Sequence, residues 1–292
     1  MTSVSALKKD NVVSLGRLAA DVAGGPVSLS ANVCLPALEH TVVLPYLTYC
    51  ASEVGHGAAD GAKGLANAVL AYRMAEALGR PMASTATAQD WAFVKEHNAE
   101  QLVCLWIALA YACGQRFMVP IRMLCSMQGG ASQWFCGSSA TFAPLYAFVK
   151  EHGRLLNEFK AVGPLAAPAK MPTSFETSDK RQALSDALNA QPDMPICAGP
   201  DAWVFPRVKN DGSVAVHVVN MAYNVKTKSL SPQKNVEVRL ANALFKRNFS
   251  GATVYGYGVE PVKIAVKNEG SDCCFVVPEL WIWSVVTFEY WA

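Results

Sequence analysis

The chain has 292 residues, of which 52% are hydrophobic and 16% are charged. This composition predicts a large buried core and excludes an intrinsically disordered protein. The 25 basic and 23 acidic residues give a formal net charge of +2 and are scattered along the chain. A nucleic-acid partner or an anionic membrane partner is therefore not expected.

The nine cysteines are irregularly spaced, and only Cys273 and Cys274 are adjacent. There is no zinc-type spacing and there are only five histidines, so neither a metal site nor a cofactor is expected. Residues 1–22 lack the form of a signal peptide, and the most apolar stretch, 102–114, is too short to cross a bilayer. As it stands the sequence predicts a soluble, cytoplasmic chain with reduced thiols, whereas a longer parent protein could be secreted.

The first 162 residues alternate between short apolar strands, polar turns and helices. The expected strands cover residues 27–32, 45–52, 82–86 and 116–120. The expected helices cover residues 12–23, 60–78, 91–113 and 140–159. Strand, polar turn and helix thus follow one another about four times, which predicts parallel strands with helices packed outside them. The strands are apolar because both of their faces are expected to be covered.

Residues 163–201 are expected to connect two domains, since residues 162–200 hold six of the sixteen prolines, and a helix is expected at 178–190. After this connector the hydrophobic period changes to two. Strands with this period are expected at residues 214–220, 235–240, 261–266 and 281–289. The sequence therefore predicts an α/β domain over residues 1–162 and an all-β domain, an antiparallel β-sandwich, over residues 202–292.

The order of these elements resembles the C-terminal half of a TIM-barrel glycoside hydrolase followed by its accessory β-sandwich domain. The segments that carry the resemblance are residues 27–32, 52–56, 101–120, 146–152, 215–220 and 275–280. A complete barrel has about eight βα units, of which about four precede the connector. The resemblance implies a partial (β/α) barrel with exposed strand edges, which would favour self-association or a complementing chain.

The resemblance also implies a catalytic carboxylate at a strand end, because barrel enzymes place their active sites there. Glu53 follows the second predicted strand and is the expected catalytic residue. The alternative is a solvated turn glutamate or one that caps a helix. Glycosidases act with two carboxylates, and the sequence does not identify a partner for Glu53.

Polar and aromatic side chains near the other strand ends are the expected sugar contacts. Asn32 ends the first predicted strand, and His56, flanked by glycines, either binds a sugar hydroxyl or is simply exposed. Asp90 and Trp91 follow the third strand and could supply a hydroxyl contact and a stacking face. Alternatively, Asp90 is the N-cap of a helix and Trp91 packs inward. Trp134, in the loop after the fourth strand, is the expected platform for a sugar ring.

No G-x-S-x-G, P-loop or H-E-x-x-H motif occurs, so α/β-hydrolase, NTPase and zincin activities have no support. The predicted function is that of a glycoside hydrolase-like protein, a fragment or truncated form, acting on glycosidic bonds of an oligo- or polysaccharide. The alternative is a non-catalytic carbohydrate-binding remnant of such an enzyme. The unidentified second carboxylate favours weak binding and poor hydrolysis by the isolated chain.

Overall fold

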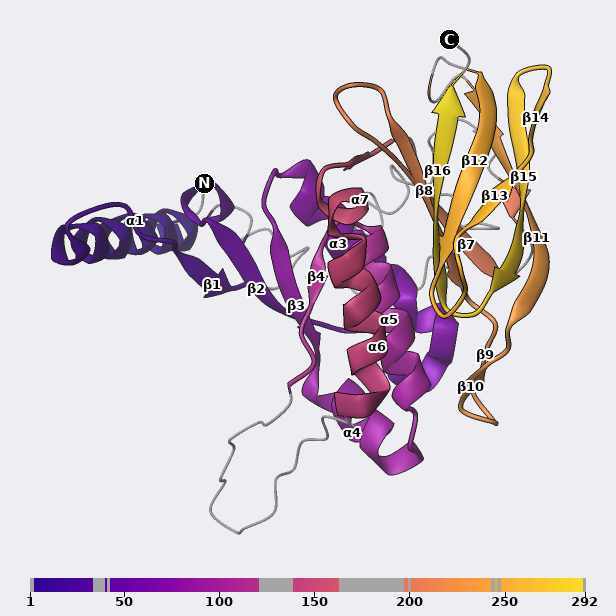
Figure 1. Ribbon diagram of the computed structural model, residues 1–292. Helices are drawn as coiled ribbons and strands as arrows, with labels where there is room; N and C mark the ends of the chain where they lie inside the picture. Colours follow the sequence, from indigo (N-terminus) through magenta and orange to yellow (C-terminus); the bar gives the residue numbers. More distant parts are fainter. Residues whose placement is uncertain are drawn as a thin grey trace.

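A parallel sheet with helices forms the N-terminal part of the molecule, and antiparallel sheets form the C-terminal part (Figure 1). The computed structural model describes residues 3–33, 40, 43–120, 139–162, 197–198, 201–242, 245 and 248–290. Most of the predicted connector, with its expected helix, and the loop that carries Trp134 lie outside these residues. The predicted domain boundaries therefore stay predictions.

The N-terminal part alternates between strands and helices. Its elements are α1 (Ser3–Ala23), β1 (Ser30–Asn32), η1 (Leu44–Tyr46), β2 (Tyr49–Val54), η2 (Ala58–Leu65), α3 (Ala66–Ala77), β3 (Met82–Ala86), α4 (Ala88–His97), α5 (Glu100–Ala112), β4 (Arg116–Phe117), α6 (Ser139–Glu151) and α7 (Gly153–Asn157). Strands β1 to β4 pair in chain order and are parallel, which confirms the predicted α/β arrangement. The four described strands form an open row, so a barrel is not confirmed.

Several predicted boundaries are wrong. The strand expected at residues 45–52 begins with the 3₁₀ turn η1, and the extended backbone of β2 starts only at Tyr49. The helix expected at residues 91–113 is two helices, because Asn98 adopts the left-handed conformation (φ 53°) that ends α4. The helix expected at residues 140–159 is likewise divided, into α6 and α7.

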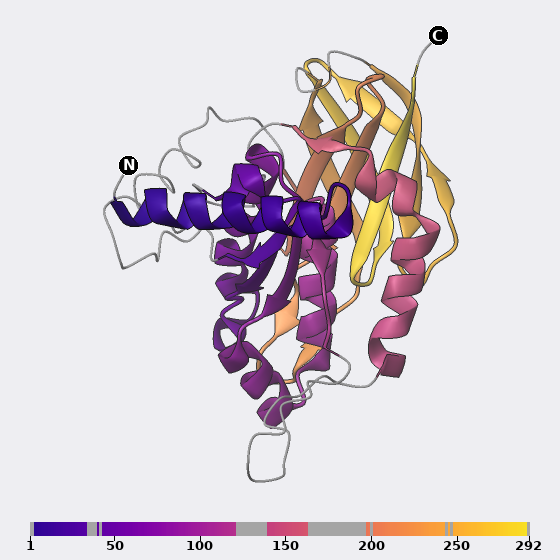
Figure 2. The same ribbon diagram turned by 90° about the vertical axis from the view of Figure 1, so that its left-hand side faces the viewer.

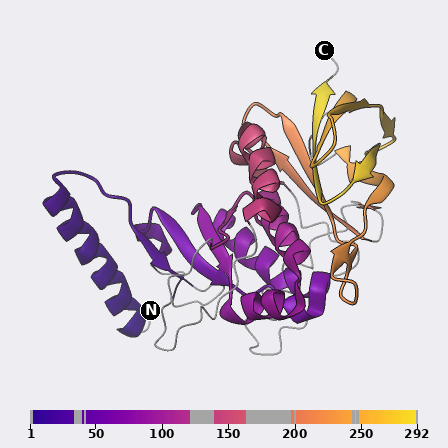
Figure 3. The same cartoon turned by 60° about the horizontal axis from the view of Figure 1, so that its bottom comes forward.

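The parallel sheet is buried on one face and open on the other. Along β2 the buried residues Cys50, Ser52 and Val54 alternate with Tyr49, Ala51 and Glu53, which are exposed or half-buried. Helix α5 contacts both β4 and the antiparallel strands, and residues 102–112 are therefore buried on every side. Helix α1 lies at the outer end of the sheet, beyond β1 (Figure 3).

The C-terminal part is made of antiparallel strands, as predicted. They are β5 (Lys160–Ala161), β6 (Cys197–Ala198), β7 (Ala202–Val208), β8 (Val214–Asn220), β9 (Tyr223–Asn224), β10 (Ser229–Leu230), β11 (Gln233–Ala241), β12 (Phe249–Gly256), β13 (Val262–Ile264), β14 (Val266–Glu269), β15 (Asp272–Leu280) and β16 (Trp283–Tyr290). One sheet has the order β13-β12-β16-β8-β7-β5, and a second has the order β14-β15-β11-β6. A buried apolar cluster contains residues of both sheets, as expected for a sandwich.

The six-stranded sheet is covered on both faces. The second sheet packs on one face, and α5 and α6 lie against the other (Figure 2). Phe148 of α6 contacts Trp283 of β16, with ring centroids 5.2 Å apart. Every residue of β8 is consequently buried, which explains why its sequence is almost continuously apolar.

A partly buried ion pair joins the two parts of the molecule. Arg207 of β7 donates through Nη2 to Glu76 Oε1 of α3 at 2.8 Å and to the Phe159 carbonyl at 2.5 Å. Gly114 makes room for this guanidinium, because a Cβ at that position would lie 2.3 Å from Nη2. Gly114 also has a φ of 75°, a conformation that other residues rarely adopt.

None of the described helices is long and apolar enough to cross a membrane. In the same part of the chain, no group of three or more histidine, cysteine or acidic side chains is placed to hold a metal ion.

Candidate functional site

A cavity of about 290 Å³ lies where strands β2 and β3 end. Its described lining is Glu53, Thr85, Ala86, Ala88, Trp91, Met118 and Pro120. Two of these residues, Glu53 and Trp91, are site residues predicted from the sequence. The volume is at the small end of the range for ligand pockets and suits a ligand about the size of a monosaccharide.

Glu53 lies inside β2, which corrects its expected position in a turn after the strand. The parallel register places it opposite Thr85 of β3. Its side chain is exposed on the open face of the sheet, because the alternation of the strand sends the neighbouring residues Ser52 and Val54 toward the helices. The Glu53 carboxylate is therefore accessible to a ligand in the cavity.

Trp91 belongs to the first turn of α4 and is only 2% exposed. Its Nε1–H donates to Thr85 Oγ1 at 3.3 Å, and its ring packs edge-on against Trp106 with centroids 5.9 Å apart. With so little of its surface exposed, the ring offers no open face to a ligand. The expected stacking face is therefore wrong, and the alternative of an inward-packed tryptophan fits the structure.

Asp90 is buried and does not belong to the described lining of the cavity. Its carboxylate accepts hydrogen bonds from the backbone N–H groups of His56 and Ala58, each at 2.9 Å, and from Thr87 Oγ1 at 2.8 Å. The N-cap of α4 is Thr87, so the alternative role expected for Asp90 as N-cap is also wrong. Asp90 instead links the turn after β2 to helix α4 through these hydrogen bonds.

His56 is fully buried, which corrects its expected place at the surface or on a sugar. Its Nδ1–H donates to the Val54 carbonyl at 2.7 Å, and this leaves Nε2 to accept from the Tyr72 hydroxyl at 3.1 Å. Burial lowers the pKa of His56 to about 4, although the nearby Asp90 carboxylate acts in the opposite direction. The imidazole is consequently neutral at pH 7 and has a structural role.

Asn32 and Trp134 do not contribute to the described cavity. Asn32 is the last residue of β1 and is exposed, but β2 separates it from Thr85. Trp134 lies outside the described residues. Thr85 and Met118 are cavity residues that the sequence analysis missed. The strand register could have identified Thr85, because the residue opposite an exposed Glu53 shares its face of the sheet.

Glu53 is the only carboxylate among the described residues that line the cavity. Glycoside hydrolysis requires two carboxylates that are separated by roughly 5–9.5 Å, depending on mechanism. The described geometry can therefore bind a polar ligand and offers one acid or base, but it does not provide the pair that hydrolysis needs.

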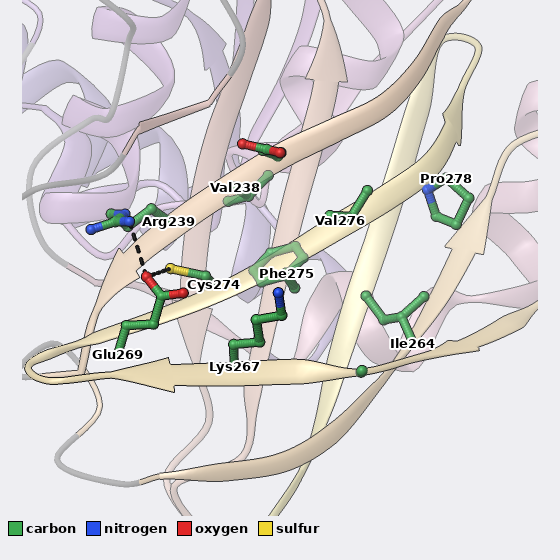
Figure 4. Close-up of a pocket in the computed structure, with 11 residues that line it drawn as sticks. Val238, Arg239, Ile264, Lys267, Glu269, Cys274, Phe275, Val276 and Pro278 are labelled. Atoms are coloured by element: carbon green, nitrogen blue, oxygen red, sulfur yellow. Dashed lines mark hydrogen bonds and ion pairs between the residues drawn. The ribbon is translucent and has the colours of Figure 1, made fainter.

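A second cavity, of about 610 Å³, lies on the outer face of the smaller sandwich sheet (Figure 4). Arg239 donates to Glu269 at 3.1 Å and to Asp272 at 3.3 Å along one side of it, and the Cys274 thiol lies 3.7 Å from Glu269. Val276 and Pro278 of β15 form part of its apolar lining. None of the residues predicted to form the site lies here.

No family model and no curated protein sequence matches this chain. Among solved structures, a rhamnosidase from a Novosphingobium species aligns with 87% of the chain at a TM-score of 0.48 and 11% identity. A cycloisomaltooligosaccharide glucanotransferase from a Paenibacillus species aligns with 63% at a TM-score of 0.42 and 14% identity. The chain spans only 36% and 26% of these two proteins, respectively. Both TM-scores are below 0.5, so these likenesses support no functional assignment.

Proposed function

We propose that this chain is a carbohydrate-binding protein of the glycoside hydrolase type, and that the Glu53 cavity is its saccharide site. The observation that carries the proposal is that Glu53 and Trp91, both predicted as site residues from the sequence, line one cavity. This cavity lies at the carboxyl edge of parallel strands, where α/β proteins of both barrel and open-sheet type bind ligands.

The polar groups of the cavity suit a sugar. The Glu53 carboxylate accepts hydrogen bonds from ligand hydroxyls. Thr85 Oγ1 already accepts from Trp91 Nε1, so its own hydroxyl proton remains available for a ligand oxygen. With one carboxylate and no partner in the described lining, we expect binding to exceed hydrolysis.

The open sheet is proposed to be part of a (β/α) barrel that another chain, or a second copy, completes. Support comes from exposed apolar side chains on α1, which are Leu15 (62% exposed), Leu18 (60%) and Val22 (82%). Apolar groups at such helical spacing normally pack against a neighbour. Sedimentation of the purified chain tests the second copy directly, since a monomer at every concentration would exclude it.

The test of the saccharide site is a panel of aryl glycosides and oligosaccharides, assayed for both binding and hydrolysis. The chain is compared with Glu53→Gln and with the matched control Glu96→Gln, which alters an exposed carboxylate on α4 outside the cavity lining. We expect weak saccharide binding that Glu53→Gln reduces at least about tenfold, because a carboxylate is a stronger acceptor than an amide. The control is expected to bind like the unaltered chain.

The other outcomes decide between the alternatives. Rapid hydrolysis that Glu53→Gln abolishes would show a complete catalytic site and would replace the binding role with an enzymatic one. Binding or hydrolysis that is unchanged in Glu53→Gln would place the saccharide site elsewhere and refute the proposal.

A further inference from the structure

The polar lining of the cavity comes from strands β2 and β3, and most of its apolar lining comes from other elements. Its two polar side chains, Glu53 and Thr85, come from opposite positions on β2 and β3. The remaining lining comes from the end of β3, from α4 and from the segment after β4, and consists of Ala86, Ala88, Trp91, Met118 and Pro120. A ligand that fills the cavity therefore meets hydrogen-bonding side chains only on the strands, and it meets apolar groups mostly on α4 and on the segment after β4.

The separation of polar from apolar lining residues disfavours binding of a sugar that has hydroxyl groups on every side. A hydroxyl that loses water and finds no partner destabilises the complex, and the described apolar side chains provide no acceptor. The single indole N–H among them already donates to Thr85. A ligand methyl group has no such requirement and gains from burial.

We propose that the cavity selects a 6-deoxy sugar, and this inference rests on the proposed function. Ring hydroxyls bind Glu53 and Thr85, and the methyl group that replaces the primary alcohol packs against the apolar lining. Met118, which is 46% exposed, suits this contact because its unbranched thioether chain adapts to the shape of a small apolar group.

The test uses pairs of sugars that differ only in whether carbon 6 is a methyl group or a primary alcohol. The pairs are D-fucose with D-galactose and L-rhamnose with L-mannose. Binding to the whole chain is measured by NMR titration. In at least one pair the 6-deoxy sugar is expected to bind about tenfold more tightly than its partner, which is the discrimination that one small group brings in an apolar pocket.

A substitution at Met118 tests whether the apolar lining causes the preference for the 6-deoxy sugar. Met118→Gln keeps the length of the side chain and adds an amide that can pair with the primary hydroxyl, so the tenfold preference is expected to fall or reverse. The control is Val262→Thr on β13, where an apolar side chain of similar exposure (43%) lies outside the cavity lining. It should leave the preference unchanged, and circular dichroism verifies that both variants fold.

Three results would overturn the inference, and each is distinguishable from the others. If both sugars of each pair bind equally, or the hydroxylated one binds more tightly, and Glu53→Gln weakens both, the proposed function stands and the 6-deoxy selectivity is wrong. If none of these sugars nor any member of the glycoside panel binds, the proposed function fails as well. A preference that Met118→Gln does not alter would also refute the assigned methyl contact.

Discussion

The two cavities described above depend on polar groups that differ in their exposure to water. Beside the Glu53 cavity the supporting carboxylate, Asp90, is 5% exposed and accepts three hydrogen bonds. In the second cavity, on the outer face of the smaller sandwich sheet and called the groove below, the side chains of Arg239 and Glu269 are 48% and 50% exposed. Their ion pair is therefore in contact with water. Hydrogen bonds to a buried charge contribute more than exposed ion pairs, because water competes for the exposed groups. The polar groups beside the smaller cavity are therefore held in place more strongly than those of the groove.

The largest effect is expected from Asp90→Ala. This change leaves the backbone N–H groups of His56 and Ala58 without their partner, and we expect a loss of about 3–5 kcal/mol in the free energy of unfolding. Urea unfolding measures it, with Glu269→Ala in the groove as the control, for which less than about 1 kcal/mol is expected. Equal losses in the two variants would remove the distinction between the cavities.

A second substitution extends the comparison to the interface between the two parts. Gly114→Ala places a methyl group against the Arg207 guanidinium and forces an unfavourable φ, so we expect a loss of about 2–4 kcal/mol. Gly258→Ala is the matched control, because its φ is 77° but a Cβ there meets no atom within 4 Å. It should cost only about 1–2 kcal/mol from backbone strain. Similar unfolding midpoints would show that the guanidinium shifts freely.

One buried histidine in each part makes stability depend on pH. Burial lowers the pKa of His56 to about 4 and that of His217 well below its usual value. Both histidines are neutral in the folded state, whereas the unfolded chain takes up protons below a pH of about 6.5. Their contribution is thus complete above that pH and is lost as the pH falls toward 4; for His56 the loss at pH 5 is about 2 kcal/mol.

Urea unfolding at pH 7 and pH 5 measures this loss. The pH dependence should become shallower in His56→Gln and in His217→Gln, since each variant removes one of the two groups. A free energy of unfolding that does not change between the two pH values would mean that the histidines are accessible to protons in the folded state.

The smallest effect is expected in the groove itself. Arg239→Gln removes the ion pairs that an exposed guanidinium makes with Glu269 and Asp272, and we expect at most a marginal change in the free energy of unfolding, because water solvates the guanidinium. High salt should reduce the difference further, because it screens exposed charges. A loss of several kcal/mol that persists in high salt would show that the groove is held as firmly as the Glu53 cavity.

Local sequence patterns alone determined much of the architecture. Strands β3 and β8 begin and end where their apolar patterns predict them, at residues 82–86 and 214–220. The change from βα alternation to a period of two also predicted parallel pairing before the connector and antiparallel pairing after it. Such features were predictable because backbone periodicity and glycine or proline stop signals act over a few neighbouring residues.

Only the tertiary structure decided which polar groups face the Glu53 cavity. His56 stands between glycines in the sequence, yet it is buried because Asp90, 34 residues later, binds its backbone and Tyr72 binds its ring. Glu53 meets Thr85 through the strand register, and Gly114 makes room for Arg207 from the other part of the chain. The burial of a side chain and its hydrogen-bond partners depend on residues that are distant in sequence, so no local pattern predicts them. The cavity likewise forms only when those segments pack together.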